Sequence, residues 1–138
     1  MAYTTQQLLQ DEIGGLAKLT EALDDDDGGT LDTDMVGRIL QRASDAVDSF
    51  LSGRYIVPLA PVPKLAGEAA LIFACEIIFN RRRQGADEKN PYTSRANGFR
   101  EELKEIADRK KSLDAVERPA FTPGALTSTP SKTQGSSL

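Results

Sequence analysis

The stretch KLAGEAALIFACEIIFNRRRQG, residues 64–85, decides the fold of this chain. Between Ala69 and Phe79 it is apolar on nearly every side, which predicts a central helix covered by several other helices. Glu76 interrupts this apolar surface, so we expect its carboxylate to reach solvent or a cationic partner. The basic run that follows complements the helix dipole, and Gly85 is expected to end the helix. The stretch therefore predicts an all-α bundle built around this helix.

Apolar residues at helical spacing predict further helices before and after the central one. The clearest begins at Asp32 or Thr33, since either is a good N-cap, and Gly53 is expected just past its end. Three prolines within six residues then predict an extended connector whose last proline opens the central helix. In the last helix, Glu105 and Arg109 are expected to form an ion pair. The expected fold is all-α, a small bundle of about four to five helices. Besides the central helix, we predict helices near residues 5–13, 16–23, 33–52 and 92–113.

The composition predicts one domain with a thin core. The chain has 138 residues, which is enough for one ordinary domain but not for two. Aromatic residues make up only 6% and tryptophan is absent, so the core must be small and aliphatic. This suits a small, elongated or oligomeric helical protein better than an enzyme with a large core.

From Glu117 onward the chain is rich in Pro, Ser, Thr and Gly and has few large apolar residues. Such a segment cannot form its own core, so we expect an extended arm that a partner protein holds in place. The chain is therefore divided into a helical domain, residues 1–116, and a C-terminal arm, residues 117–138. The expected partner-binding residues of the arm are Pro119, Phe121, Pro123 and Leu126.

The missing residue types exclude several kinds of chemistry. The chain has no histidine, which removes Ser–His–Asp triads and the usual zinc and iron sites. Its one cysteine, Cys75, lies in an apolar run and is expected to be a buried thiol. No glycine-rich phosphate loop is present. We therefore expect no catalytic residues, no enzymatic activity and no resident cofactor.

The N-terminus has neither the basic region nor the apolar region of a signal peptide. The longest apolar run is also too short to span a bilayer. These two observations predict a soluble protein, made in a reducing cytoplasm and without contact with a membrane.

Charge is unevenly distributed along the chain, whose net charge is −4. Residues 1–30 contain seven acidic residues and one basic residue, whereas residues 79–111 contain ten basic and six acidic residues. This polarity favours electrostatic contact between neighbouring copies, although the basic run could instead contact DNA phosphates. The expected subunit-interface residues are Arg81, Arg82, Arg83, Asp24, Asp25 and Asp26.

The stretch LDDDDGGTLD, residues 23–32, is close to a calcium-binding loop but does not complete one. An EF-hand loop needs acidic ligands at fixed positions, a glycine at position 6 and a glutamate at position 12. With Gly29 at position 6, position 12 is Met35; with Gly28 there, position 1 is Leu23. We therefore interpret the stretch as a solvated turn between helices. The alternative is a weak divalent-cation site at Asp24, Asp26 and Asp32.

A block around the proline-rich connector carries a more specific pattern, roughly Asp-x-x-Leu-x-Gly-Arg-Tyr-x-x-Pro-Leu-x-x-x-Pro. With its flanking helices it resembles the Mu-type phage gp36-like family over about residues 2–115. One departure is the acidic turn, because relatives often have Asp-x-Asp-Gly-Asp-Gly there, which makes metal binding less expected here. The residues that match the pattern are Asp48, Leu51, Gly53, Arg54, Tyr55, Pro58, Leu59 and Pro63.

This resemblance implies a head–tail connector, also called an adaptor or head-completion protein, in a tailed phage or prophage. Such proteins form a ring, typically of twelve copies, beneath the portal protein, where they extend the DNA channel and present a platform for a tail-side or stopper protein. In related adaptors the C-terminal arm reaches the portal or a neighbouring subunit. DNA is expected to pass without sequence-specific binding. The implied location is the neck of the virion, after assembly in the host cytoplasm.

Two other classes of function fit parts of the sequence. A small DNA-binding regulator would use the basic run and would show salt-dependent affinity for DNA. A calcium-responsive interaction module would use the acidic turn and would melt at a higher temperature with calcium.

Overall fold

The computed structural model describes residues 2–23, 29–82, 89–113 and 115–117, and it confirms the all-α fold. No strand is present in these ranges, although Tyr55 and Glu117 form one isolated antiparallel bridge. The five helices are α1 (Gln6–Ile13), α2 (Leu16–Leu23), α3 (Thr33–Leu51), α4 (Lys64–Arg82) and α5 (Thr93–Ala107).

Side-chain caps begin α1 and α3, and the cap of α3 is one of the two residues predicted from the sequence. The hydroxyl of Thr5 caps α1 by accepting a hydrogen bond from the N–H of Leu8. One carboxylate oxygen of Asp32 caps α3 by accepting hydrogen bonds from the N–H groups of Asp34 and Met35, at 3.0 and 3.1 Å. The predicted starts of α1 and α3 are therefore confirmed.

Gly53 lies just past the end of α3, as predicted; it follows the cap residue Ser52 and does not have a positive φ. The end of the last helix differs from the prediction. The last helix ends at Ala107 and not near residue 113, and Arg109 then turns the chain with a φ of 67°. Because this turn moves Arg109 off the helix face, the predicted pair with Glu105 is wrong. Glu105 pairs with Lys111, and Arg109 with Glu117.

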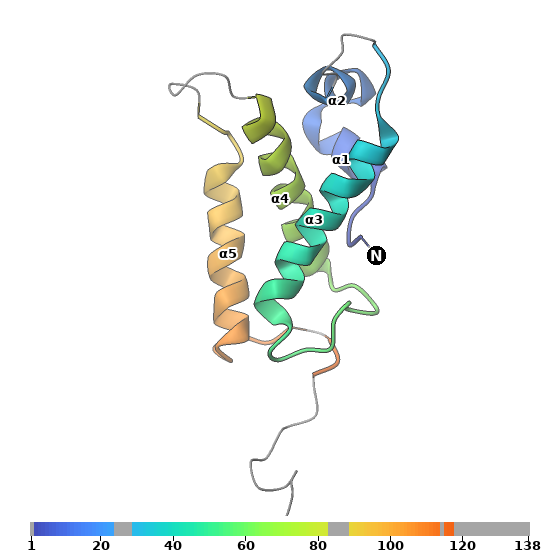
Figure 1. The fold of residues 1–138 in the computed structure, drawn as a ribbon. Helices are drawn as coiled ribbons and strands as arrows, with labels where there is room; N and C mark the ends of the chain where they lie inside the picture. The colour runs from blue at the N-terminus through green and yellow to red at the C-terminus, as the bar shows by residue number, and fades with distance from the viewer. Residues whose placement is uncertain (1, 24–28, 83–88, 114, 118–138) are drawn as a thin grey trace, which may run out of the picture.

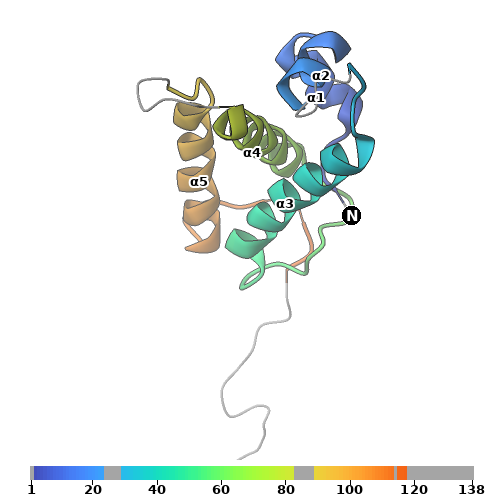
Figure 2. The ribbon, with the colours of Figure 1, turned by 45° about the horizontal axis from the view of Figure 1, so that its top comes forward.

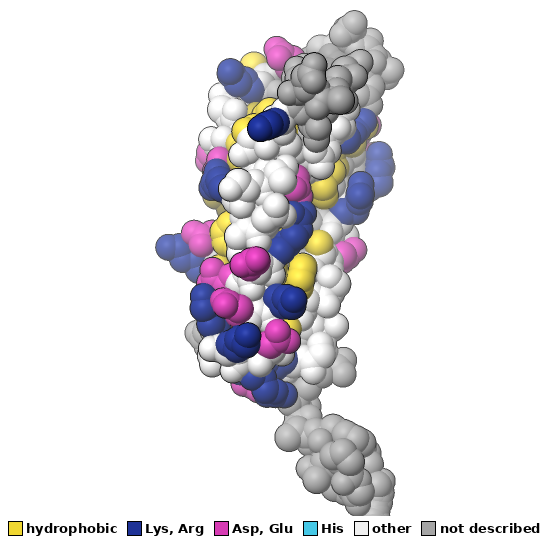
Figure 3. Space-filling view, turned by 90° about the vertical axis from the view of Figure 1, so that its left-hand side faces the viewer, with side chains coloured by type: hydrophobic (Ala, Val, Ile, Leu, Met, Phe, Trp, Pro, Cys, Tyr) yellow, Lys and Arg dark blue, Asp and Glu magenta, His cyan; other side chains and the backbone are white. Residues whose placement is uncertain are grey.

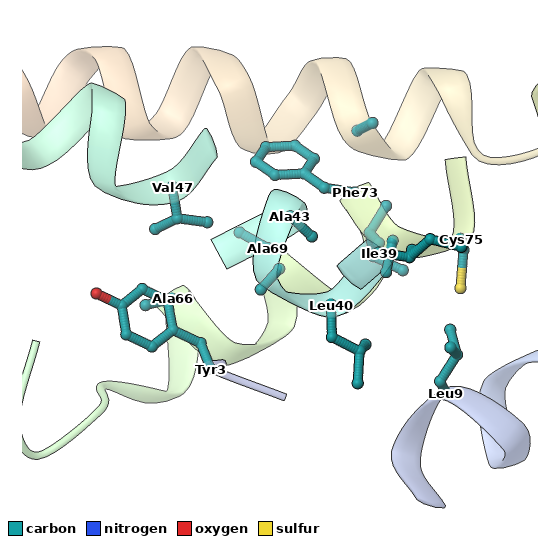
Figure 4. Packing of buried hydrophobic residues seen from close by; sticks show 14 of the residues in the cluster. Tyr3, Leu9, Ile39, Leu40, Ala43, Val47, Ala66, Ala69, Phe73 and Cys75 are labelled. Carbon is teal, nitrogen blue, oxygen red and sulfur yellow. The ribbon is translucent and has the colours of Figure 1, made fainter. Parts of the chain in front are cut away.

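The central position of α4 is confirmed. This helix packs against all four others, with α3 and α5 on either side and the α1–α2 hairpin against one end (Figures 1 and 2). Small side chains allow this close approach: Ala66, Ala69, Ala70 and Ala74 of α4 are completely buried. Figure 4 shows aliphatic side chains of α1, α3 and α4 meeting there, and most residues of the buried core are aliphatic.

Glu76 has the cationic partner that its apolar surroundings require. Its side chain is buried and forms an ion pair with the guanidinium of Arg100 on α5. The same guanidinium lies over the ring of Phe73, 5.1 Å from its centre, and donates to the side-chain oxygen of Asn97 at 2.7 Å. This cluster fixes α5 against α4.

The outer face of α5 carries charges of both signs, interspersed with only a few apolar side chains (Figure 3). Exposed residues of α5 and the turn after it include Glu101, Lys104, Asp108, Lys110 and Lys111. This face is therefore not a continuous basic surface of the kind that DNA-binding helices usually present.

Candidate functional site

The residues of the recognised pattern lie where α3 ends and the proline-rich connector begins. The N–H groups of Arg54 and Tyr55 both donate to the carbonyl of Leu51, which winds the chain back beneath the last turn of α3. This turn directs both side chains inward: Tyr55 is completely buried and Arg54 is only 8% exposed. A buried arginine needs partners within the protein; both terminal nitrogens of Arg54 have them, whereas its Nε has none among the residues that the structure describes.

The guanidinium of Arg54 binds the last turn of α5 and the chain that follows it. Its Nη1 donates to the carbonyls of Ile106 and Lys111, both at 2.7 Å. Its Nη2 lies 3.3 Å from a carboxylate oxygen of Glu117. One planar, permanently charged group thus holds three points of the C-terminal segment.

Tyr55 and Ile56 add two contacts to the same segment. The hydroxyl of Tyr55 accepts a hydrogen bond from the N–H of Leu113 at 2.9 Å, and the N–H of Ile56 donates to the carbonyl of Val116 at 2.9 Å. The Arg54 guanidinium also lies over the Tyr55 ring, 5.0 Å from its centre. We call Arg54, Tyr55, Ile56, Val116 and Glu117 the arm-base joint, because the arm begins there.

A second group of contacts attaches the N-terminal segment to the same pattern. The hydroxyl of Tyr3 donates to the carboxylate of Asp48 and accepts from the N–H of Leu59 at 2.8 Å. The N–H of Tyr3 donates to the hydroxyl of Ser44 at 2.8 Å. Gly67 of α4 leaves room for this N-terminal segment, since a Cβ there would lie 3.3 Å from the Tyr3 carbonyl oxygen.

Burial controls the protonation of this second group. The pKa of Tyr3 is raised to about 12, mainly by desolvation and also by the hydrogen bond to Asp48. Desolvation also raises the pKa of Asp48 above its ordinary value, although the hydrogen bond from Tyr3 opposes this shift. These groups attach the N-terminal segment to α3.

A third polar cluster joins α1 to the start of α5. The Tyr92 hydroxyl donates to the Glu12 carboxylate at 3.3 Å, and Arg95 pairs with the same carboxylate at 3.2 Å. The thiol of Cys75 is buried beside them, which confirms the prediction for this residue. Burial raises the pKa values of Cys75 and Tyr92 to about 12, so both keep their protons at neutral pH.

The structure describes few of the predicted interface and arm residues. Arg81 is exposed near the end of α4, where its Nη1 lies 3.2 Å from the Met35 sulfur. The backbone of Arg82 belongs to α4, and its side chain is not described. The predicted residues outside the described ranges are Asp24, Asp25, Asp26, Arg83, Pro119, Phe121, Pro123 and Leu126.

The structure gives a role to one of the three residues predicted to bind a divalent cation. Asp32 uses a carboxylate oxygen to cap α3, whereas Asp24 and Asp26 lie outside the described ranges. Among the residues that the structure describes, no three or more acidic or cysteine side chains gather as a metal site would require. Within the same part of the chain, none of the helices combines the length and apolar character needed to cross a membrane.

Sequence reasoning missed two residues that complete these sites. Tyr3 precedes the first helix, so helical periodicity gave no signal for it. Glu117 was assigned to the arm, although its carboxylate reaches Arg54 and Arg109. The available signal was the arginine within an apolar block, because a buried guanidinium requires partners that the local sequence does not supply.

The chain matches one protein-family model, described as Bacteriophage Mu, Gp36, over residues 3–128. The match includes all of the helical domain from Tyr3 onward and the first part of the arm. No curated protein matches the chain.

Proposed function

The chain belongs to the Mu Gp36 family of bacteriophage proteins, and from this premise we propose that it is a structural virion protein. In this proposal it is a head–tail connector, an adaptor that forms a ring below the portal and extends the DNA channel. The observation that supports this most directly is the arm-base joint, in which Arg54 and Tyr55 fix the start of a long arm to a rigid bundle. A subunit whose purpose is to link two assemblies needs such a fixed starting point.

The distribution of charge supports a ring of identical subunits. The acidic residues Asp24, Asp25 and Asp26 follow α2, and the basic run begins at Arg81 near the end of α4. Figure 1 shows that the ends of α2 and α4 lie at the same end of the molecule. A contact between the acidic surface of one copy and the basic surface of the next is heterologous, because the two copies contribute different surfaces. Repeated contacts of this kind close a ring when the rotation from one copy to the next divides a full turn evenly. We propose a ring of about twelve copies, as in the adaptors that the chain resembles.

Charge reversal tests this ring contact. A variant in which residues 81–83 are glutamate should fail to assemble, and so should one in which residues 24–26 are lysine. The variant that carries both changes should recover assembly, because each new surface again meets its opposite charge. Native mass spectrometry and electron microscopy give the ring size, and failure of the double variant to recover would refute the charge contact.

The arm supplies the proposed contact with the portal or with a neighbouring subunit. Its apolar residues Phe121 and Leu126 are separated by polar and proline-rich chain, which suits docking of an extended segment in a partner's groove. Because Glu117 belongs to the arm-base joint, the informative deletion begins at residue 118. That truncated protein should remain folded and should no longer bind portal in a co-sedimentation assay. Normal binding by the truncated protein would refute this role of the arm.

In this proposal the protein is neither an enzyme nor a metalloprotein, and it acts in the neck of the virion after assembly in the host cytoplasm. A tail-side or stopper protein binds the opposite face of the ring. DNA passes through the channel without sequence-specific recognition, since a net negative subunit does not hold phosphates strongly. A gel shift at low and moderate salt tests this. A DNA-binding regulator would form a complex with DNA at low salt, and that complex would weaken as the salt concentration rises.

A further inference from the structure

A groove lies between α2 and the chain that enters α3. Leu16 is 52% exposed in it, and is one of the few large apolar side chains that the described residues leave open to solvent. Glu21 stands at its border, and four aspartates, residues 24–27, follow α2 in the chain. The groove therefore offers an apolar surface beside acidic residues. We call it the α2 groove; its volume is about 490 Å³, and it is lined by Leu16, Ala17, Thr20, Glu21 and Gly29.

A surface of opposite charge lies on α3. Met35, Arg38 and Arg42 are spaced i, i+3 and i+7, which places them on one face of the helix. Met35 is half-buried, whereas both arginines are exposed. Arg81 reaches the same face from α4, with its Nη1 at 3.2 Å from the Met35 sulfur. We call these four residues the Met35 face.

The two arginines of α3 have no partner among the residues that the structure describes. Neither the Arg38 nor the Arg42 side chain forms a hydrogen bond or an ion pair there. Asp34 and Asp45 belong to the same helix but do not pair with them, and Asp45 instead accepts a hydrogen bond from Gln41 at 2.8 Å. Like charges one helical turn apart repel each other, so carboxylates from another molecule would stabilise this face.

We propose that the Met35 face of one copy docks in the α2 groove of the next copy. The flexible thioether of Met35 adapts to an irregular apolar surface such as that around Leu16. The arginine stems cover apolar surface while their guanidinium groups reach the carboxylates at the border of the groove. A second copy is the occupant because the two surfaces of this one chain have complementary charge.

This inference rests on the proposed function, because it identifies where neighbouring subunits of the ring meet. The contact is heterologous, as the proposed ring contact is, and Arg81 belongs to both. It adds to that contact an apolar component from Leu16 and Met35. It also adds the two arginines of α3, which lie outside the basic run at residues 81–83.

Cross-linking of the full chain at introduced cysteines tests this contact. A chain with both Ala17→Cys and Arg42→Cys should give a ladder of linked species with a short bismaleimide, because each copy is joined to the next. Either substitution alone should give only monomer on a denaturing gel. The native Cys75 is completely buried and does not react. Ala17→Cys combined with Glu101→Cys, at an exposed residue of α5, is the matched control and should also give no ladder.

Charge reversal then shows whether the arginines stabilise the contact. Addition of Arg38→Glu to the double-cysteine chain should remove the ladder, because the glutamate would face the acidic border of the groove. Lys110→Glu, the same change at an exposed lysine after α5, should leave the ladder unchanged. Circular dichroism shows whether the bundle is intact in each variant, and Arg38→Gln replaces Arg38→Glu if the glutamate prevents folding.

The results separate this contact from the proposed ring. Absence of a ladder, when native mass spectrometry shows that the unsubstituted chain forms a ring, would overturn the contact and leave the ring intact. Absence of both the ladder and the ring would overturn both. Linked dimers from a single-cysteine chain would mean that like surfaces meet, and a ladder that persists with both Arg38→Glu and Arg38→Gln would exclude the arginine. Either of these results would also overturn the proposal.

Discussion

Replacement of Arg54 by methionine should destabilise the protein more than any exposed ion-pair substitution. Methionine keeps most of the buried stem but removes the guanidinium that donates to the carbonyls of Ile106 and Lys111. A hydrogen bond to a charged group contributes about 1.5 to 3 kcal/mol. The Ile106 carbonyl keeps a second donor, the N–H of Arg109, and the Lys111 side chain is exposed, so we take the lower value for each bond. The expected loss in the free energy of unfolding is about 3 kcal/mol.

The assay is urea unfolding of the full chain, followed by far-ultraviolet circular dichroism. With a slope of about 1 to 3 kcal/mol per molar urea, the loss moves the unfolding midpoint by roughly 1 to 3 M. Glu117→Gln is the matched control, because it removes only the ion pairs that Glu117 forms with Arg54 and Arg109, and the glutamate side chain in them is 48% exposed. That control should cost about 1 kcal/mol or less. Arg54→Lys should fall between the two, since one ammonium group cannot reproduce the forked contacts.

Hydrogen exchange gives a second measurement that is specific to the joint. In Arg54→Met, the backbone N–H groups of Leu113 and Ile56 should exchange faster. Both form hydrogen bonds between the segment after α5 and the start of the connector, and this segment loses its anchor when the guanidinium is removed. The reasoning would be refuted if Arg54→Met were no less stable than Glu117→Gln, or if both N–H groups kept their protection.

Three further predictions follow from the fold. Arg100→Ala should cost about 2 kcal/mol more than Glu76→Met in urea unfolding, because it leaves the Glu76 carboxylate buried without its partner; equal costs would contradict this. The free energy of unfolding should fall from about pH 9 upward, because in the unfolded chain Tyr3, Cys75 and Tyr92 lose protons that they retain to about pH 12 in the folded protein. Urea unfolding midpoints at about pH 7, 9 and 10.5 measure this, and a constant midpoint would contradict it. Calcium at millimolar concentration should leave the melting temperature unchanged, whereas a rise that is lost in the Asp24→Ala, Asp26→Ala variant would favour the calcium-responsive alternative.

Local sequence signals were sufficient for most of the helices. Leu16–Leu23 was predicted with its exact bounds, because two glycines precede it and the acidic turn follows it. The central helix was recognisable because an apolar surface on every side requires neighbours on every side. Glu76 was predicted to reach solvent or a cationic partner; the structure shows the second, although the sequence could not identify Arg100 as that partner.

The errors concern interactions between segments that are distant in sequence. Continuing amphipathic spacing suggested that α5 extends to residue 113, but tertiary contacts end it at Ala107. The carbonyls of Ile106 and Lys111 bind Arg54, which is more than fifty residues away in sequence. Helical periodicity contains no information about such a contact. The joint could therefore be recognised in the sequence only as a pattern of residues. Its role in holding the C-terminal segment is visible only in the three-dimensional structure.

The arm-base joint also determines where mechanical force would enter this molecule. A pull on the arm is transmitted at Glu117 and Val116, and from there through Arg54 and Ile56 to the end of α3. The chain from Ile106 to Leu113 is held at Ile106, Lys111 and Leu113, so a pull on the arm does not unwind α5 turn by turn. The load thus passes to α3, which packs on the central helix, and several hydrogen bonds must break together before the bundle opens.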